Sequence, residues 1–247
     1  MRITIPVTMS GIDWIPTLTQ ERPPSATVDG VYALLVEQYG VPENRNPPDP
    51  LDELVAAILS QNTSDGNSRR AFASLRTAFK SWIEVAAAPV GDVADAIRSG
   101  GLAEQKAPRI KSVLRAVLDD PMGGDLSQLV RWDIHDARTY LTSLSGVGVK
   151  TAACVLLFSL GLAAFPVDTH VHRVVRRLGL VPLAASASKT QEHLESMVPE
   201  NRMYPYHMNL IRHGRQVCRA HRPECARCNL QPVCAFYSRE VASTEAQ

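Results

Sequence analysis

Leu144-Ser145-Gly146-Val147-Gly148-Val149-Lys150-Thr151-Ala152 places two glycines between two segments with helical periodicity. Glycine adopts positive φ at little steric cost, so the chain can reverse sharply here. The turn also leaves unpaired backbone N–H groups at the start of the next helix. Such a helix start attracts phosphate through these donors and through the positive end of the helix dipole. An ordinary tight turn between two helices would explain the glycines equally well.

Lys150 stands just after this turn, at the beginning of the second helical segment. The helix dipole and burial would both lower the pKa of an amine at this position. A lysine with a lowered pKa is a usable nucleophile and forms Schiff bases. A solvated lysine, or a lysine that only contacts phosphate, is the alternative interpretation.

Asp168 lies in Val167-Asp168-Thr169-His170, directly before another segment with helical periodicity. The position predicts an N-cap, in which the carboxylate accepts a hydrogen bond from the first turn. A carboxylate at the mouth of a cavity can also relay a proton and stabilise a developing oxocarbenium charge. Both roles are compatible with the sequence.

The remainder of the chain reads as almost entirely helical. Asp49-Pro50 predicts a helix start, with proline at the first helical position. Apolar residues then recur at helical spacing within 51–59, 110–118 and 134–144. Ser188 to Gln191 fits a capping box before a further helix. The alternating stretch from Ile3 to Val7 is too short to anchor a sheet.

Composition sets further bounds on the protein. The chain has 247 residues, of which 45% are hydrophobic and 21% charged, as expected of a globular protein. No apolar run approaches the roughly 20 residues that span a bilayer, and we see no secretory signal. We therefore expect a cytoplasmic protein that does not contact membranes. The net charge is only +1, so binding of nucleic acid would have to rest on local clustering of charge.

Four of the five cysteines, Cys218, Cys225, Cys228 and Cys234, fall within one short segment with spacings of six, two and five residues. Tight clustering and an odd total argue against a disulfide framework and favour a metal site. Zinc modules usually pair two CxxC motifs, whereas this segment has one, and iron–sulfur clusters are also held by four cysteines. Cys154 lies outside this set and is expected in the core. Basic residues crowd the same segment and predict a phosphate contact; they are Arg212, Arg215, Arg219, His221, Arg222 and Arg227.

The motif Leu-x-Gly-Val-Gly-x-Lys-Thr-Ala, followed by Val-Asp-Thr-His, resembles the helix-hairpin-helix DNA glycosylase superfamily. With the cysteine spacing, the chain is similar to the endonuclease III family from about residue 50 to about residue 237. The resemblance implies an all-α, two-lobed fold with a [4Fe–4S] cluster on the four cysteines. It also implies a monomeric DNA glycosylase with AP lyase activity, acting on double-stranded DNA that carries an oxidised pyrimidine or an abasic site.

The resemblance assigns roles to particular residues. Lys150 would be the nucleophile on C1′ of the flipped nucleotide, and Asp168 the carboxylate that activates it. Relatives that act on adenine mispairs usually lack a lysine at this hairpin position, so Lys150 argues against that branch. Further DNA contacts are implied for Gly146, Gly148, Val149, His170, Arg219 and Arg222.

Two loops, 60–65 and 101–107, would fill the gap that a flipped base leaves in the duplex. A gapless match places Asn62 where the family inserts its glutamine, and a one-residue shift would place Gln61 there. Leu102 is an apolar residue on a predicted turn, which suits a wedge between bases. Asp65 could contribute only a helix cap.

We expect residues 46–164 to form one helical lobe with the hairpin at about 137–160, and residues 1–45 with 165–247 to form the cluster lobe. Two alternatives to the oxidised-pyrimidine enzyme stay open. One is a mismatch-specific uracil or thymine DNA glycosylase, and the other is a DNA-binding module without catalysis. The sequence does not name the damaged base, because base selectivity depends on pocket shape.

Overall fold

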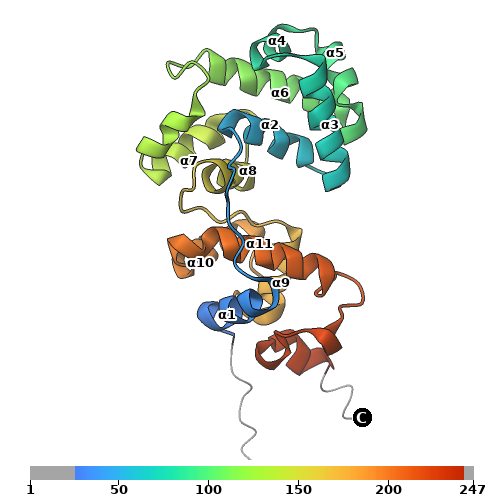
Figure 1. Cartoon of the computed structure of the whole chain (residues 1–247), viewed down its shortest axis with the longest axis vertical. Helices are drawn as coiled ribbons and strands as arrows, with labels where there is room; N and C mark the ends of the chain where they lie inside the picture. The colour runs from blue at the N-terminus through green and yellow to red at the C-terminus, as the bar shows by residue number, and fades with distance from the viewer. Residues whose placement is uncertain (1–25, 242–247) are drawn as a thin grey trace, which may run out of the picture.

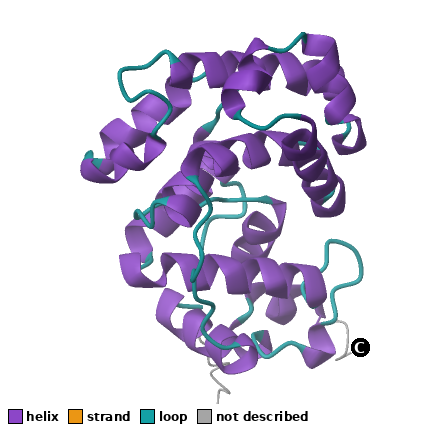
Figure 2. Cartoon of the chain, turned by 45° about the horizontal axis from the view of Figure 1, so that its top comes forward, coloured by secondary structure: helices purple, strands orange, loops and turns teal. Residues whose placement is uncertain are grey.

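The computed structural model describes residues 26–241, and every regular element in that range is helical. Figure 2 shows helices and loops without a strand in this part of the chain. The prediction of an all-α protein is therefore confirmed. The alternating stretch from Ile3 to Val7 lies outside the described residues. No helix in the described range is both long and apolar enough to cross a bilayer.

The upper lobe in Figure 1 is built around one hydrophobic core. Helix α2 (Pro50–Ser60) lies inside it and packs against α3 (Asp65–Ala78) and α6 (Ala103–Leu118). Seven of the eleven residues of α2 are buried, so this helix is the centre of the lobe. The other elements of the lobe are α4 (Trp82–Ala87), α5 (Val90–Ala96), α7 (Ile134–Ser143), α8 (Val149–Cys154), and the 3₁₀ turns η1 (Arg98–Gly100) and η2 (Leu126–Arg131).

The lower lobe has a core of its own, to which the first and the last parts of the described range contribute. Helix α1 (Val28–Tyr39) packs against α11 (Glu200–Gln216), and α11 packs against α9 (Thr169–Leu178). The two-lobed architecture is thereby confirmed, and the lobe boundaries at residues 46 and 164 stay a prediction. The remaining elements are α10 (Ala187–Met197), the short 3₁₀ turns η4 (Cys225–Arg227) and η5 (Gln231–Val233), and the π turn η6 (Tyr237–Val241).

The lobes are joined where α8 continues into the π turn η3 (Val155–Ser159). Leu156 is buried in the upper core and Leu157 in the lower core, so adjacent residues anchor one helical rod in both lobes. The amide of Asn44 donates to the carbonyl of Phe158 at 2.7 Å, which ties the second connection between the lobes to the same turn. The two cores are therefore held together at η3.

The structure confirms two of the predicted helix caps and replaces two others. Asp49 caps α2 and Asp168 caps α9, as predicted. Ser186, and not Ser188, caps α10, because its side chain already accepts the N–H of Lys189 two residues before the predicted start. Asp65 does not cap α3; Ser64 takes that role and leaves the carboxylate of Asp65 for another partner.

The two glycines of the hairpin are under different structural constraints. Gly146 has φ of +78°, and a Cβ added there would collide with the side chain of Arg109. Gly148 caps α8 with φ of −91°, and a Cβ there would meet nothing within 4 Å. Only Gly146 is required by both backbone conformation and space.

We therefore expect Gly146→Ala to destabilise the protein and Gly148→Ala to be a mild, matched control. A non-glycine residue in the left-handed region costs roughly 1–2 kcal/mol before any clash, which lowers Tm by about 2–8 °C in a chain of this size. Alanine in place of glycine at an N-cap should cost less than about 1 kcal/mol. Thermal melts of the two variants measure the difference, and equal melting points would contradict the assignment.

Candidate active site

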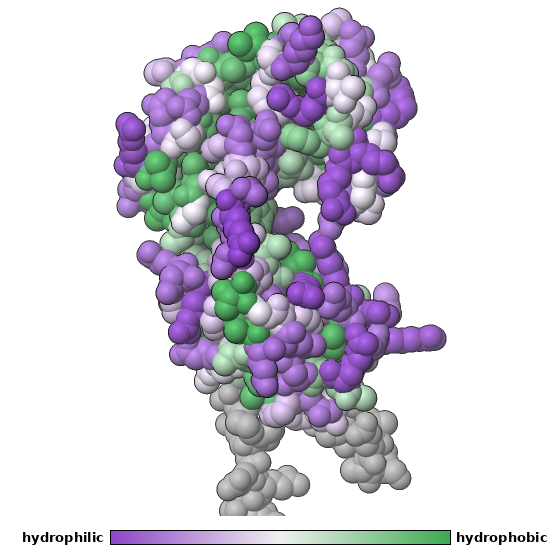
Figure 3. All heavy atoms as spheres, in the orientation of Figure 1, coloured by the Kyte–Doolittle hydropathy of each residue, from purple (hydrophilic) through white to green (hydrophobic). Residues whose placement is uncertain are grey.

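A cavity of about 560 Å³ opens between the two lobes and collects residues from both. The upper lobe contributes the end of α2, the loop that follows it and Lys150. The lower lobe contributes the start of α9 with Asp168, and Arg215 near the end of α11. In Figure 3 the surface is hollowed between the lobes, with hydrophilic residues along the right side of the hollow. The lining residues are Ser60, Gln61, Asn62, Thr63, Asp65, Lys150, Val167, Asp168, Thr169, His170, His172, Ala187 and Arg215.

Lys150 is the second residue of α8, directly after the hairpin glycines. Its side chain is exposed, so the expectation that burial acts on this amine is wrong. The reason is its position on the cavity wall, whereas the following residues, from Thr151 onward, enter the core. Lys150 is thus an accessible amine on a fixed helix start.

Asp168 faces the same cavity from the opposite lobe. Its Oδ1 accepts the backbone N–H of Val171 at 2.7 Å, so the predicted N-cap is present. The buried His207 of α11 lies close enough for Asp168 to act on it electrostatically. Burial lowers the pKa of His207 to about 4, which keeps this ring neutral at neutral pH. A hydrogen bond and a neutral ring therefore surround the carboxylate in the lower lobe.

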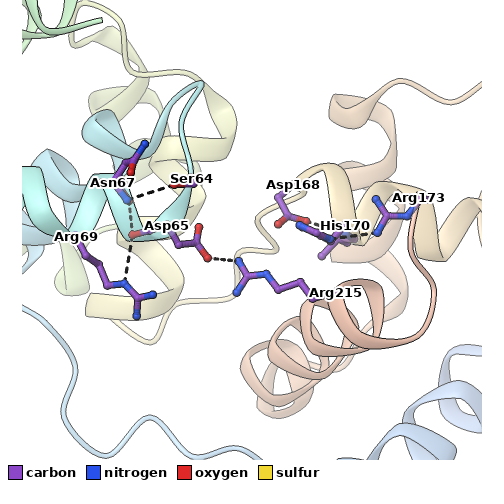
Figure 4. Close-up of polar contacts among 10 residues, drawn as sticks. Ser64, Asp65, Asn67, Arg69, Asp168, His170, Arg173 and Arg215 are labelled. Carbon is purple, nitrogen blue, oxygen red and sulfur yellow. Dashed lines mark hydrogen bonds and ion pairs between the residues drawn. The ribbon is translucent and has the colours of Figure 1, made fainter. Parts of the chain in front are cut away.

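An ion pair crosses the mouth of this cavity. Figure 4 shows Asp65 of α3 and Arg215 of α11 facing one another from opposite lobes, and the two side chains meet at 2.6 Å. Asp168 and His170 lie beside Arg215 in the same view. Both members of the pair are about half exposed, so its contribution to stability is small, below about 1 kcal/mol. Its geometric effect is to place two opposite charges at the cavity edge.

The two residues proposed to fill the DNA gap have different environments. The amide oxygen of Gln61 accepts a hydrogen bond from Arg109 at 2.7 Å, and its amide nitrogen lies 3.4 Å from the hydroxyl of Thr151. Gln61 therefore braces α2 against the hairpin. Asn62 adopts a left-handed backbone conformation with a positive φ of 53°. Both residues line the cavity, and which of them enters the duplex stays a prediction.

Leu102 lies outside the cavity, at the start of α6. It adopts a left-handed conformation with φ of 53° and its side chain is 46% exposed. The buried amine of Lys106 donates to the carbonyls of Leu59 and Gly100 at 2.7 and 3.0 Å. The same lysine thus fixes both proposed gap-filling loops relative to one another. Val149, beside the hairpin, is also 43% exposed and faces away from the core.

Glu53 of α2 is a second carboxyl that interacts electrostatically with Lys150 of α8, and the two helices pack against one another. Burial raises its pKa to about 7, and the charge of Lys150 opposes that rise. Cys154, one turn beyond Lys150, is buried as expected, and burial raises its pKa to about 12. Glu53 is not among the residues that line the cavity.

The four clustered cysteines line a second, separate cavity in the lower lobe. All four are half-buried free thiols. Arg177 donates to the sulfur of Cys218 at 3.4 Å, and His213 Nε2 lies 3.5 Å from the sulfur of Cys228. Within residues 26–241, no group of three or more histidine, cysteine or acidic side chains is arranged to hold a metal ion. The structure thus brings the cysteines around one cavity without drawing them to a single point.

The arginines of the cysteine segment are only partly available to DNA. Arg219 and Arg227 both pair with Glu224, at 3.1 and 2.7 Å. Arg222 is exposed and has a positive φ of 54°. None of the three lines the cavity that holds Lys150, so the phosphate contacts expected of Arg219 and Arg222 stay a prediction.

Three features of the site were missed by the sequence analysis. Glu53 is one of two charged residues on α2, next to Asp52, and His207 lies in a helix far along the chain. Arg215 stood out only as part of a basic segment, and its pairing with Asp65 depends on how the lobes meet. The sequence signals for them are the charge of Glu53 in a largely apolar helix and the place of Arg215 in a basic segment.

Comparison with known proteins identifies the family of the chain. Residues 55–200 match the family model described as the HhH-GPD superfamily of base excision DNA repair proteins. Endonuclease III of Thermotoga maritima is 35% identical over 198 residues, which are 80% of this chain and 88% of that protein. A protein of Arabidopsis thaliana is 41% identical over 165 residues, and the chain spans 56% of its length.

Solved structures that resemble this chain also include endonuclease III. The chain is similar to a trapped covalent intermediate of endonuclease III with DNA, with a TM-score of 0.74 and 26% identity. The match covers 89% of this chain and 97% of the endonuclease III chain. A thermostable thymine-DNA glycosylase shares the fold at 22% identity and a TM-score of 0.70.

The role of Asp168 as the N-cap of α9 can be separated from a catalytic role by measuring the thermal stability of two variants. Asp168→Ala removes the cap and should cost about 1 kcal/mol, or roughly 2–4 °C in Tm. Asp168→Asn retains an oxygen that accepts the N–H of Val171 and should melt within about 1 °C of the wild type. Thermal melts of both variants test this. A fall for Asn as large as that for Ala would mean that the negative charge at the helix start, and not the hydrogen bond, stabilises α9.

Proposed function

The chain belongs to the HhH-GPD superfamily of base excision DNA repair proteins, and within it to the endonuclease III group, and on this basis we propose that it is a bifunctional DNA glycosylase and AP lyase. Its substrate would be double-stranded DNA with an oxidised pyrimidine or an abasic site. The observation that carries the proposal is the shared cavity of Lys150 and Asp168. The two residues come from different lobes and face one hollow beside the hairpin.

The chemistry follows from an amine and a carboxylate in one cavity. The neutral amine of Lys150 attacks C1′ of the flipped nucleotide, and the base departs with the electron pair of its glycosidic bond. The carboxylate of Asp168 stabilises the positive charge that develops on the sugar. The nitrogen then loses a proton, and its electron pair opens the sugar ring by breaking the C1′–O4′ bond, which gives an imine. The imine acidifies C2′, and loss of a C2′ proton with departure of the 3′ phosphate by β-elimination breaks the strand on the 3′ side. The trapped covalent intermediate of endonuclease III with DNA supports this route.

DNA would be held by contacts that do not depend on its base sequence. The hairpin of Gly146, Gly148 and Val149 presents backbone N–H groups at the start of α8 to a phosphate. Gln61 or Asn62 from one loop, and Leu102 from the other, would occupy the gap left by the flipped base. His170 lines the cavity and would contact the DNA strand there. Arg219 and Arg222 would contact the strand outside the cavity. We propose that the protein acts as a cytoplasmic monomer.

The four cysteines fit a [4Fe–4S] cluster better than a single metal ion. Cys218, Cys225, Cys228 and Cys234 surround a cavity instead of one point, and N–H groups of Arg177 and of the backbone reach their sulfurs. Hydrogen bonds to sulfur are typical of cysteine-ligated clusters. When bound, the cluster would fix the loop between α11 and the C-terminal turns without taking part in the reaction.

Lys150 should be the residue that forms the imine. Lys150→Gln should therefore abolish borohydride trapping on an abasic-site duplex and abolish strand cleavage, while Tm stays unchanged because the side chain is exposed. Lys189→Gln is the matched control, since Lys189 is an exposed lysine of α10.

Asp168→Asn should lower turnover more than DNA affinity.

The outcomes distinguish the remaining alternatives. Trapping at the wild-type level by Lys150→Gln would place the nucleophile elsewhere. A wild-type protein that binds duplex DNA and never traps would be a binding module. A panel of duplexes with oxidised pyrimidines, uracil mispairs and thymine mispairs identifies the base that is removed, and activity on mispairs alone would favour the mismatch glycosylase.

Metal content tests the cysteine site directly. We expect brown protein with about four iron atoms per chain, as a cubane on four cysteines requires. Cys228→Ser should lose iron and colour, whereas Cys154→Ser should keep both, because Cys154 lies in the core beside Lys150. Colourless protein with one zinc per chain would overturn the cluster assignment.

A further inference from the structure

A second polar cavity, here called the α9 cavity, lies beside the one that holds Lys150 and Asp168. It has a volume of about 300 Å³ and is built on α9, with Leu183 of the following loop as its apolar wall. Three of its six lining side chains are arginines and none is acidic. The cavity is therefore suited to an anion. The lining residues are Thr169, His172, Arg173, Arg176, Arg177 and Leu183.

Two of the three arginines are engaged with the cysteine segment. Arg173 donates to the carbonyls of Gly214 and Cys218 at 2.8 and 2.9 Å. Arg177 donates to the carbonyl of Arg219 at 2.7 Å and to the sulfur of Cys218 at 3.4 Å. These two guanidinium groups are held in place by the fold. They bring positive charge to the cavity wall, while many of their N–H groups are already used.

Arg176 is the arginine of the α9 cavity whose donors are left over. Within residues 26–241, no carboxylate lies within 4 Å of its guanidinium. Its Nε is buried and has no hydrogen-bond partner there, so the side chain lies against the protein instead of extending into solvent. A buried donor without a partner is unfavourable, and a bound anion would supply that partner.

The α9 cavity adjoins the active-site cavity. Thr169 and His172 line both of them. Thr169, His172 and Arg176 are three and four residues apart and so share one face of α9. His172 is fixed at the boundary, because its Nε2–H donates to the carbonyl of Ala185 at 2.9 Å. A polar face of α9 thus leads from the active-site cavity to Arg176.

The length of this face can be compared with the rise of a DNA strand. Arg176 lies seven residues after Thr169, which is about 10 Å along the axis of a helix. A DNA strand advances about 3.4 Å per nucleotide, so this length corresponds to roughly three nucleotide steps. A strand that follows α9 away from the active-site cavity would therefore bring one of its phosphates to Arg176.

We propose that the α9 cavity is a phosphate site for the damaged strand, in which Arg176 binds a backbone phosphate about three nucleotides from the flipped one. The inference rests on the proposed function, because the flipped nucleotide sets the position of the strand. The planar fork of N–H groups on a guanidinium suits two phosphate oxygens. The fixed charges of Arg173 and Arg177 add attraction. Such a contact positions the strand and does not read its bases.

Equilibrium binding to a duplex with a tetrahydrofuran abasic analogue tests the site without any chemistry. Arg176→Gln should bind about tenfold more weakly, as the loss of a charge-assisted hydrogen bond implies. The slope of log affinity against log salt should flatten by about one. Arg176→Lys keeps the positive charge and should retain the wild-type slope. Arg131→Gln is the matched control and should bind as the wild type does, because Arg131 is an exposed arginine of η2 that lines neither cavity.

Neutral methylphosphonates locate the contact on the DNA. A single methylphosphonate is placed in turn at each phosphate of the damaged strand on both sides of the analogue. One position, about three nucleotides from the analogue, should weaken wild-type binding as much as Arg176→Gln does. The same substitution should cost Arg176→Gln nothing further. This non-additivity marks a direct contact, and a purely structural role of Arg176 would not produce it.

The variant should also leave the fold and the chemical step unchanged. The Tm of Arg176→Gln should stay within about 2 °C of the wild type, because no hydrogen bond of Nε and no ion pair is lost. The rate of imine trapping at saturating protein should not change, since Arg176 does not line the cavity of Lys150. A slower saturated rate with unchanged affinity would place Arg176 in the chemical step and overturn the phosphate role.

Other outcomes separate this inference from the proposed function. Wild-type affinity and salt slope in Arg176→Gln, in a protein that binds and traps normally, would overturn the inference alone. Additive losses at every methylphosphonate position would do the same. If inorganic phosphate raises the Tm of the wild type and not that of Arg176→Gln, while no methylphosphonate position is specific, the cavity binds a free anion and the DNA contact is wrong. A wild type that does not bind the duplex would overturn the proposed function and the inference together.

Discussion

The burial of α2 is the constraint on which the site depends. Seven residues of this helix are buried, and five other elements, α3, α6, α8, η2 and η3, pack against it. A buried helix cannot rotate or slide without opening cavities, at a cost of several kcal/mol per large side chain. Its polar residues are therefore fixed as firmly as its apolar ones. Gln61, directly after its end, contacts the hairpin at Gly146 and Thr151 of α8.

The lobes are connected by polar contacts at their edges and by an apolar junction. The ion pair of Asp65 with Arg215 is half exposed and weak, and the pair of Arg138 with Glu195 at 2.9 Å is better shielded. The main junction is apolar, where Leu156 and Leu157 of η3 enter different cores. A cavity bounded by two separately packed lobes keeps its shape near η3. Its outer mouth, closed by an exposed ion pair, can yield to a duplex at little cost.

Arginines in the lower lobe have two distinct uses. Arg173 and Arg177 of α9 donate to backbone carbonyls of Gly214, Cys218, Arg219 and Ala220, and so hold the cysteine segment against the core. Arg219 and Arg227, within that segment, share Glu224 at the surface. The basic character of the segment is therefore partly structural. Arg222, on an exposed left-handed residue, is the arginine of the segment best placed to reach a phosphate.

Local chemistry in the sequence determined the helical class, the caps at Asp49 and Asp168, and the reversal at Gly146, because each depends on a few neighbouring residues. The motif around Lys150 also identified the family, since its spacing is short and specific. The placement of Ser186 as the cap of α10 shows the limit of such signals, because two serines two residues apart offer similar caps and only packing selects one. Tertiary structure alone decided that Lys150 is exposed, that Asp65 meets Arg215, and that Glu53 and His207 lie behind the two proposed catalytic residues. These contacts join residues roughly 40 to 150 positions apart, and the packing of two cores, which no local pattern encodes, brings them together.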